Sequence, residues 1–135
     1  MSESTNTIGF EQDAYAAAYP ETRPFWEAAA EGRLLVKACR ACGRAHWYPK
    51  VVCPFCHSAD LEWRDASGRG TIYTYSVMRR VEVPYVLAYV TLEEGPTLMT
   101  NIVDCDVDSV RIGQAVQVRF RQAPQGRTVP VFAPA

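Results

Sequence analysis

Four of the five cysteines stand in two Cys-x-x-Cys pairs, and ten residues separate the pairs. Each short turn brings two sulfurs to one point, and two turns supply the four thiolates of a tetrahedral zinc site, with Zn–S bonds of about 2.3 Å. A shell closed by four thiolates has no open position for a substrate, so the spacing predicts a structural zinc ion. Iron is a second candidate in recombinant material, because such a shell accepts both metals. The predicted ligands are Cys39, Cys42, Cys53 and Cys56.

Other uses of these cysteines are weighed against zinc. One Cys-x-x-Cys pair alone also fits a thioredoxin-like redox site, and His57 after Cys56 completes the haem-attachment pattern Cys-x-x-Cys-His. Haem attachment and disulfides belong outside the cytoplasm, whereas Met1 to Ala18 lacks the basic start and apolar run of a secretory signal. We therefore favour zinc and expect His57 to be an exposed neighbour or an occasional substitute ligand.

Few other residues could carry chemistry. Acyl transfer requires a nucleophile beside a base, and after the zinc ligands only Cys105, His46 and His57 are left. We expect Cys105 to be a half-buried thiol at a strand end and His46 to be a surface or hydrogen-bonded residue. Trp47 and Tyr48 are expected to shield the zinc sulfurs from water. No catalytic residue is predicted.

Length and composition bound the class of protein. The 135 residues carry a net charge of −1 and are 48% hydrophobic, which fits one compact domain with an appendage or two small modules. No apolar run approaches the roughly 20 residues of a membrane span, so we expect a cytoplasmic protein without a membrane partner. Basic residues are not in excess, and nothing indicates attraction to phosphate.

The N-terminal part is expected to be a helical arm. Residues 1–8 are polar and expected to be disordered, and helices are expected over 10–19 and 24–30. Phe25 and Trp26 would lie about 100° apart on the second helix and form a broad aromatic face. That face either packs on the chain's own ribbon or barrel, or anchors another subunit.

The remainder reads as strands. Short strands over 33–38 and 45–48 would flank the first cysteine pair, and a helical turn is expected within 106–112. Six further strands with partial alternation of apolar and polar residues are expected over 61–65, 70–80, 85–92, 97–103, 115–121 and 128–132. Five or six such strands predict a closed Greek-key barrel of the OB type, with a two-sheet sandwich as the alternative. The predicted fold is mainly β, with a helical arm (1–36), a zinc ribbon (37–60) and an OB-fold barrel (61–135).

An ordered set of short motifs spans about residues 22 to 132. They are Phe25-Trp26, Gly32-Arg33-Leu34, Cys39-x-x-Cys42-Gly43, Tyr48-Pro49, Cys53-Pro54-x-Cys56, Gly68-x-Gly70-Thr71-Ile72-Tyr73, Pro84-Tyr85-Val86, Gly95-Pro96 and Ile112-Gly113. This set resembles a family of acyl-CoA-associated proteins, long catalogued as a domain of unknown function, that join a rubredoxin-like zinc ribbon to an OB-fold domain. The resemblance implies an accessory subunit of thiolase-fold enzymes, or of hydratases or aldolases acting on acyl-CoA thioesters.

Two functional interpretations follow. In the first, the chain is a non-catalytic subunit of an acyl-CoA enzyme, with Phe25 and Trp26 among its anchors. Arginines could then contact the phosphates of coenzyme A, and the candidates are Arg79, Arg80, Arg119 and Arg121. In the second, the ribbon and barrel bind single-stranded nucleic acid. That function requires a basic groove interleaved with aromatic platforms, and the low content of basic residues disfavours it.

Overall fold

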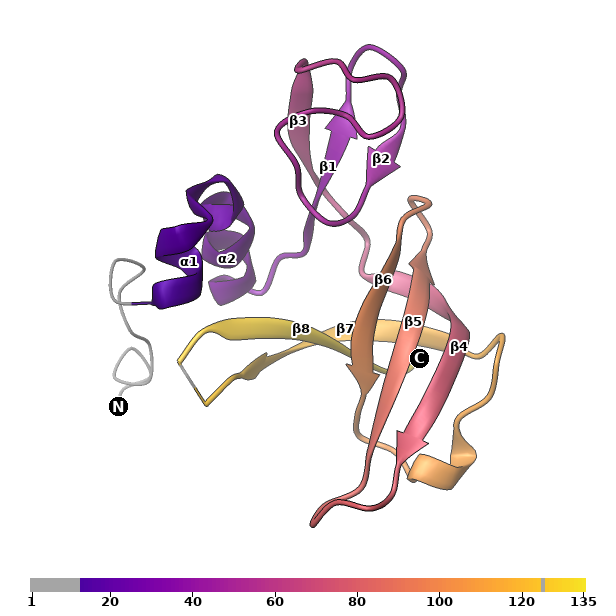
Figure 1. The fold of residues 1–135 in the computed structure, drawn as a ribbon. Coiled ribbons are helices and arrows are strands. Elements are labelled where there is room, and N and C mark those ends of the chain that lie inside the picture. The colour runs from indigo at the N-terminus through magenta and orange to yellow at the C-terminus, as the bar shows by residue number, and fades with distance from the viewer. Residues whose placement is uncertain (1–12, 125) are drawn as a thin grey trace.

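The computed structural model describes residues 13–124 and 126–135 (Figure 1). The expected disorder of residues 1–8 and the start of the first expected helix lie outside this part. Two helices, α1 (Ala14–Ala18) and α2 (Arg23–Ala30), precede eight strands. The strands are β1 (Leu35–Cys39), β2 (Ala45–His46), β3 (Leu61–Asp65), β4 (Arg69–Met78), β5 (Tyr85–Leu92), β6 (Thr97–Ile102), β7 (Ala115–Gln122) and β8 (Thr128–Pro134). No helix in the described ranges is long and apolar enough to cross a bilayer.

The second helix forms near its expected position. Pro24 stands in the first turn, where its missing N–H leaves no donor unsatisfied. Gly32 follows the helix with a φ of 80°, a left-handed conformation that suits glycine at a helix end. One face of α2 is buried, through Phe25, Trp26, Ala28 and Ala29. This face determines how the arm packs against the rest of the chain.

The ribbon is a three-stranded sheet in the order β2-β1-β3. The prediction that residues 61–65 belong to the barrel is wrong, because β3 pairs antiparallel with β1 from Leu35↔Asp65 to Cys39↔Leu61. β2 has only two residues and occupies one edge of β1, and β3 returns along the other edge immediately after the second cysteine pair. The ribbon sheet therefore continues to Asp65.

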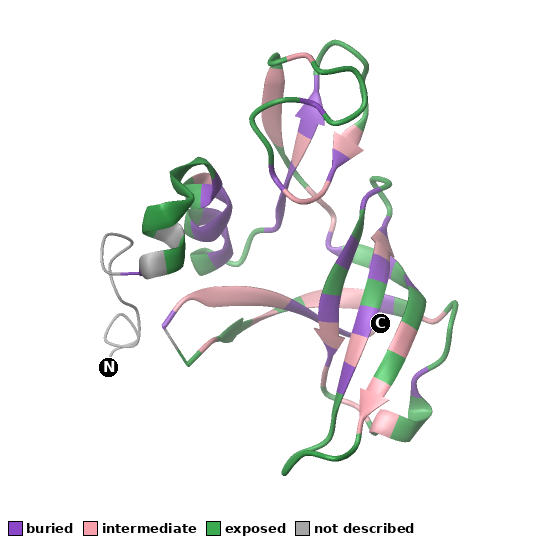
Figure 2. Ribbon diagram, in the orientation of Figure 1, coloured by how far each residue is buried: buried purple, intermediate pink, exposed green. Residues whose placement is uncertain are grey.

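The barrel is closed by five strands in the order β4-β5-β6-β8-β7. Closure includes one parallel contact, between Ile102 of β6 and Phe132 of β8, and the remaining pairs are antiparallel. This topology confirms the OB-type barrel and corrects the sandwich alternative. The expected helical turn is a short 3-10 segment, Val107–Ser109. Along β4, β5 and β6 buried and exposed residues alternate (Figure 2), so one face of each strand fills the barrel core.

The three parts of the molecule adjoin one another. Helix α2 contacts β8 and β1, and in Figure 1 the ribbon stands beyond the turn that joins β5 to β6. A cleft between ribbon and barrel is lined by residues of both. The arrangement places the cysteine turns at the far end of the ribbon from the barrel core.

Candidate metal centre and ribbon-barrel cleft

The four paired cysteines converge on one point. Their sulfur atoms all lie within 4.8 Å of one another. Cys39 Sγ is 3.5 Å from Cys56 Sγ, and Cys42 Sγ is 3.8 Å from Cys53 Sγ. Bonds of about 2.3 Å in a tetrahedral zinc site place sulfurs roughly 3.8 Å apart, so the cluster has the size of such a site. The prediction that these four residues are positioned to bind a metal is confirmed.

The two cysteine turns have the same local geometry. The amide of Gly43 donates to the carbonyl of Cys39, and the amide of His57 donates to that of Cys53, at 2.8 and 2.9 Å. Gly43 and His57 each follow a cysteine pair and both have positive φ, 79° and 68°. The His57 side chain is exposed and is not in the cysteine cluster, as expected for a neighbour.

Backbone amides also point at the sulfurs. Cys42 N donates to Cys39 Sγ and Phe55 N donates to Cys53 Sγ, each at 3.4 Å. The amide of Cys42 holds the pKa of the Cys39 thiol below its ordinary value, because the hydrogen bond stabilises the thiolate. Metal binding requires thiolates, so the turns favour the protonation state that a metal ion needs.

Trp47 and Tyr48 face the helical arm, which corrects their predicted role as a cover for the metal. The Trp47 ring lies 5.0 Å from that of Phe25, and the hydroxyl groups of Tyr48 and Tyr15 are 2.7 Å apart. These contacts attach the ribbon to the arm because the short β2 leads directly into both aromatic residues.

Phe25 and Trp26 are buried within the chain, with 1% and 8% of their surfaces exposed. Trp26 Nε1 donates to Thr22 Oγ1 at 3.1 Å, and the Phe25 ring is edge-on to Trp26 at 4.7 Å. The prediction that these residues anchor a partner is therefore corrected. The alternative, packing against the chain's own ribbon and barrel, is confirmed because Trp47 and the β8 side of the barrel cover the aromatic face.

An ion pair that sequence reasoning missed joins the arm to the barrel. Arg127 donates to both oxygens of Asp13, from Nη2 at 2.5 Å and from Nε at 2.7 Å. Asp13 is 5% exposed, and the Arg127 guanidinium also lies over the rings of Tyr15 and Trp26 at 4.8 and 4.9 Å. Because 114 positions separate the two charges, no local pattern reveals this pair.

The structure does not gather the four candidate arginines into one site. Arg79 and Arg80 lie at the end of β4, whereas Arg119 and Arg121 project from β7. Two of them are ion-paired, Arg79 with Asp108 at 2.6 Å and Arg121 with Asp104 at 2.5 Å. The loop between β6 and β7 thus supplies carboxylates that already satisfy two candidate phosphate ligands.

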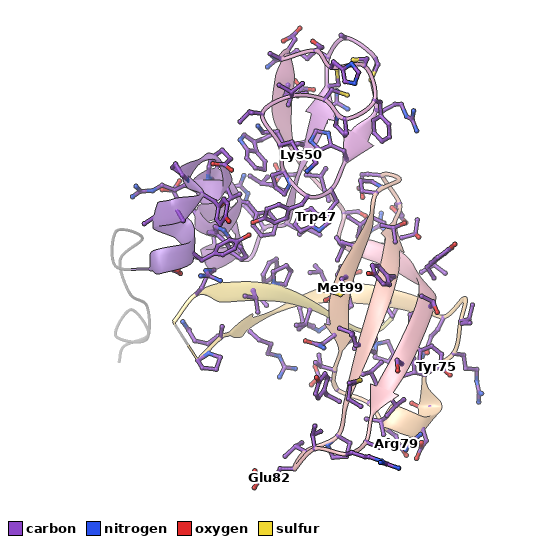
Figure 3. All side chains as sticks on the ribbon, in the orientation of Figure 1. Trp47, Lys50, Tyr75, Arg79, Glu82 and Met99 are labelled. Atoms are coloured by element: carbon purple, nitrogen blue, oxygen red, sulfur yellow. The ribbon has the colours of Figure 1, made fainter. Side chains whose placement is uncertain are left out.

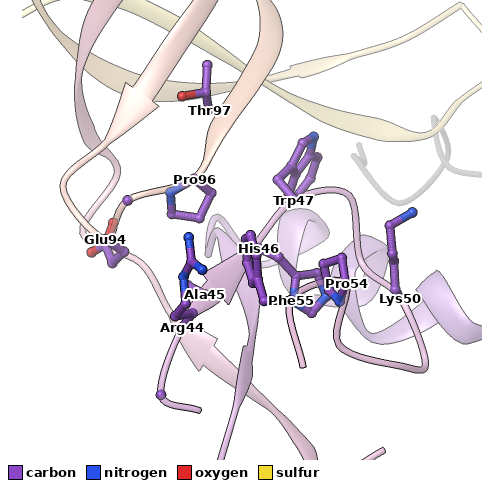
Figure 4. Close-up of a pocket in the computed structure, with 12 residues that line it drawn as sticks. Arg44, Ala45, His46, Trp47, Lys50, Pro54, Phe55, Glu94, Pro96 and Thr97 are labelled. Atoms are coloured by element: carbon purple, nitrogen blue, oxygen red, sulfur yellow. The ribbon is translucent and has the colours of Figure 1, made fainter. Parts of the chain in front are cut away.

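A cleft of about 620 Å³ separates the ribbon from the β5–β6 turn of the barrel (Figure 4). His46, Trp47 and Phe55 line it on the ribbon side, and Pro96 and Thr97 on the barrel side. His46 is 3% exposed, and neither ring nitrogen has a hydrogen-bond partner in the described part of the chain. Burial, with Lys37 and Lys50 nearby, lowers its pKa and favours the neutral ring.

The expectation of a surface or hydrogen-bonded His46 is therefore wrong. Strand β2 turns this side chain inward, and a histidine alone in the sequence carries no signal of that burial. Cys105, in contrast, is half-buried against the barrel core as expected.

Comparisons with known proteins agree with this architecture. Residues 26–62 match the family described as "ChsH2, rubredoxin-like zinc ribbon domain", and residues 63–121 match "ChsH2, C-terminal OB-fold domain". A "Probable enoyl-CoA hydratase alpha subunit" of Thermomonospora curvata is 39% identical over 117 residues, which are 82% of this chain. The matched region spans only 37% of that relative's length.

Relatives of more similar size carry a different name. A "DUF35 domain-containing scaffold protein" of Methanothermobacter thermautotrophicus is 40% identical over 91 residues, 62% of this chain and 68% of the relative. The solved structure "Ltp2-ChsH2(DUF35) aldolase" contains a chain with 36% identity and a TM-score of 0.74, covering 84% of this chain and 94% of that one.

A DUF35 protein of Sulfolobus solfataricus, of unknown function, shares the fold with a TM-score of 0.67 at 14% identity, covering 90% of this chain and 92% of that one. The ordered ribbon and barrel, the cysteine cluster and these similarities together show that the chain belongs to the DUF35 family, whose members join a rubredoxin-like zinc ribbon to an OB-fold domain.

Proposed function

We propose that this chain is a non-catalytic accessory subunit of an enzyme complex that acts on acyl-CoA thioesters. The observation that carries the proposal is the 36% identity, over 94% of its length, to a chain of the structure "Ltp2-ChsH2(DUF35) aldolase", whose title names a DUF35 chain together with an enzyme. The names of relatives as scaffold proteins and as a hydratase subunit agree with an accessory role. A thiolase-type enzyme is the partner we favour, with a hydratase or aldolase as the alternative.

The metal centre has a structural role in this proposal. Zinc is the ion that four thiolates at this separation fit best, and iron is the ion expected to replace it in recombinant material. When bound, zinc holds the two turns together, because four protein ligands complete its tetrahedral shell. The ion then stabilises the ribbon surface that adjoins the barrel.

The described residues also fit a chain without its own active site. Thioester chemistry needs a thiolate or hydroxyl beside a base. Cys105 is half-buried against the barrel core, and His46 is buried in the ribbon wall of the cleft. Catalysis would then depend on residues of the partner enzyme.

Contact with coenzyme A is a finer part of the proposal. Arg80 and Arg119 are the better candidates for phosphate binding, because neither has an acidic partner within the described residues. Arg79 and Arg121 would have to exchange Asp108 and Asp104 for phosphate oxygens. Charge-reversal variants of Arg80 and Arg119 should therefore weaken CoA binding by the complex more than those of Arg79 and Arg121.

Isolation from the native host tests the proposed function. The tagged chain should co-purify in fixed stoichiometry with a larger enzyme, identified by mass spectrometry, and the complex should turn over an acyl-CoA thioester. The purified chain alone should not do so. Turnover by the chain alone that disappears in Cys105→Ser would contradict the proposal and identify this thiol as a nucleophile.

A further inference from the structure

Three neighbouring strands of the barrel carry no charged side chain over most of their length. Residues 70–78 of β4, all of β5 and all of β6 contain no Asp, Glu, Lys or Arg. The inward half of these residues fills the core, but the outward half meets solvent in the isolated chain (Figure 2). Soluble proteins normally place charges on such exposed strand positions. The absence of charge therefore concerns the outer surface as well as the core.

The register places apolar and aromatic side chains across this surface. Tyr89 of β5 stands opposite Met99 of β6, and Thr91 stands opposite Thr97. On β4, a register shift between Ile72 and Thr74 accompanies the outward position of Tyr73. Tyr73, Tyr89 and Met99 are 67%, 46% and 58% exposed, and Met99 is labelled in Figure 3. We call the surface formed by Thr71, Tyr73, Tyr89, Thr91, Thr97 and Met99 the uncharged face.

Other strands of the same chain do carry outward charges. β7 presents Arg119 and Arg121, and β3 presents Glu62 and Arg64. The barrel is closed, so the uncharged strands have no open edge for pairing with another strand. What they expose is a sheet face, and exposed apolar faces mark contact surfaces. The contrast shows that the missing charges belong to one side of the barrel.

The composition of this face indicates a protein partner. Tyrosine and methionine are enriched at protein interfaces, and lysine and the acidic residues are depleted there. Methionine also adapts its shape to a partner surface. A nucleic acid would need basic side chains between the aromatic rings, and the uncharged face has none. A partner surface without strong charge complements it best.

The size of the face selects among protein partners. Six residues of β6 span about 20 Å and three strands about 14 Å, so the face covers roughly 300 Å². A stable interface buries about 800 Å² on each partner. A second copy bound through this face alone would therefore cover too little. A larger partner can also cover the adjoining cleft, because Thr97 belongs to both surfaces and buried His46 in that cleft lacks hydrogen-bond partners within the described residues.

We propose that the uncharged face, continued into the ribbon-barrel cleft, is the surface on which the larger acyl-CoA enzyme docks. This inference rests on the proposed function. It assigns the contact to β4, β5 and β6 rather than to the aromatic residues of α2, which the chain buries itself.

Substitution in the middle of the face tests the inference. With the enzyme subunit purified from the native complex as the probe, Tyr89→Glu should raise the Kd by at least ~30-fold, the effect of losing a hot spot of about 2 kcal/mol. Tyr89→Phe keeps the aromatic ring and should stay within ~3-fold. Val51→Glu is the matched control, because Val51 is 62% exposed on the ribbon outside the face, and it should also stay within ~3-fold.

Footprinting of the wild-type chain keeps the inference testable if Tyr89→Glu fails to fold. Hydroxyl-radical oxidation of Met99 and Tyr73 should fall at least ~5-fold in the complex, whereas that of Tyr19, which is 48% exposed on the arm, should change less than ~2-fold. A complex that forms with unchanged Met99 oxidation and an unchanged Kd for Tyr89→Glu overturns the inference but leaves the proposed function standing. Absence of any acyl-CoA enzyme from the native isolate counts against the proposed function itself. Dimers of the free wild-type chain that Tyr89→Glu dissociates would assign the face to a second copy and overturn the inference.

Discussion

The ribbon and the barrel reach a stable fold by different means. The barrel encloses a continuous apolar core that includes Ile72, Val90, Leu98 and Phe132, each at most 2% exposed. In the ribbon strands the large buried apolar side chains are Leu35 and Val36, and two of the cysteine ligands are fully buried. A small module with so little apolar surface needs another source of stability. The comparison indicates that a metal ion replaces the missing core in the ribbon.

The largest expected effect is on the ribbon alone. Cys42→Ser removes one of four ligands, and structural zinc contributes about 10–16 kcal/mol of apparent binding free energy in small finger peptides. We expect metal content to fall toward zero and the ribbon strands to lose protection from hydrogen exchange, while the barrel strands keep theirs. Elemental analysis and hydrogen exchange measured by mass spectrometry check both parts.

Cys105→Ser is the control for this experiment, because Cys105 lies outside the cluster and should leave metal content unchanged. Simultaneous unfolding of ribbon and barrel after Cys42→Ser would break the comparison, since it would show that the barrel depends on the metal.

A core substitution tests the barrel. Phe132 is fully buried where β8 meets both β6 and β7, so Phe132→Ala should lower the free energy of unfolding by about 3–5 kcal/mol. Denaturant titration measures this loss, and the metal should stay bound in the folded fraction. Phe55→Ala in the exposed second cysteine turn should cost less than ~1 kcal/mol, and an equal cost at both positions would contradict the contrast in packing.

The smallest expected effect concerns the joint between arm and barrel. Asp13→Ala leaves the guanidinium of Arg127 without its carboxylate, and breaking a buried pair costs about 3 kcal/mol when one partner stays 15% exposed. Thermal unfolding of the variant and of the double variant Asp13→Ala/Arg127→Met measures this. The double variant should recover part of the loss, because it leaves no buried charge.

Glu27→Ala provides the comparison for an exposed pair. Glu27 bonds Arg23 one helical turn away on the surface, and its loss should cost about 0.5 kcal/mol or less. A similar cost for Asp13→Ala would show that the arm is not held on the barrel by the buried pair.

Local chemistry explains what could be predicted. The cysteine spacing defines two turns whose sulfurs must meet, so Cys39, Cys42, Cys53 and Cys56 could be identified without a structure. Alternation along 70–78 and 85–92 identifies strands, because side chains change face at every residue. Both signals depend on residues that are near one another in the chain.

Only the tertiary structure decided which partners these elements have. The sequence by itself determined a cysteine site, a helical arm and a series of strands, but not that β3 pairs with β1, that α2 buries its aromatic face against Trp47, or that Asp13 meets Arg127. Each of these contacts joins segments far apart in the chain, and its free energy depends on the packing of both sides at once. The uncharged face arises in the same way, because only the register of three strands brings Tyr89 and Met99 together.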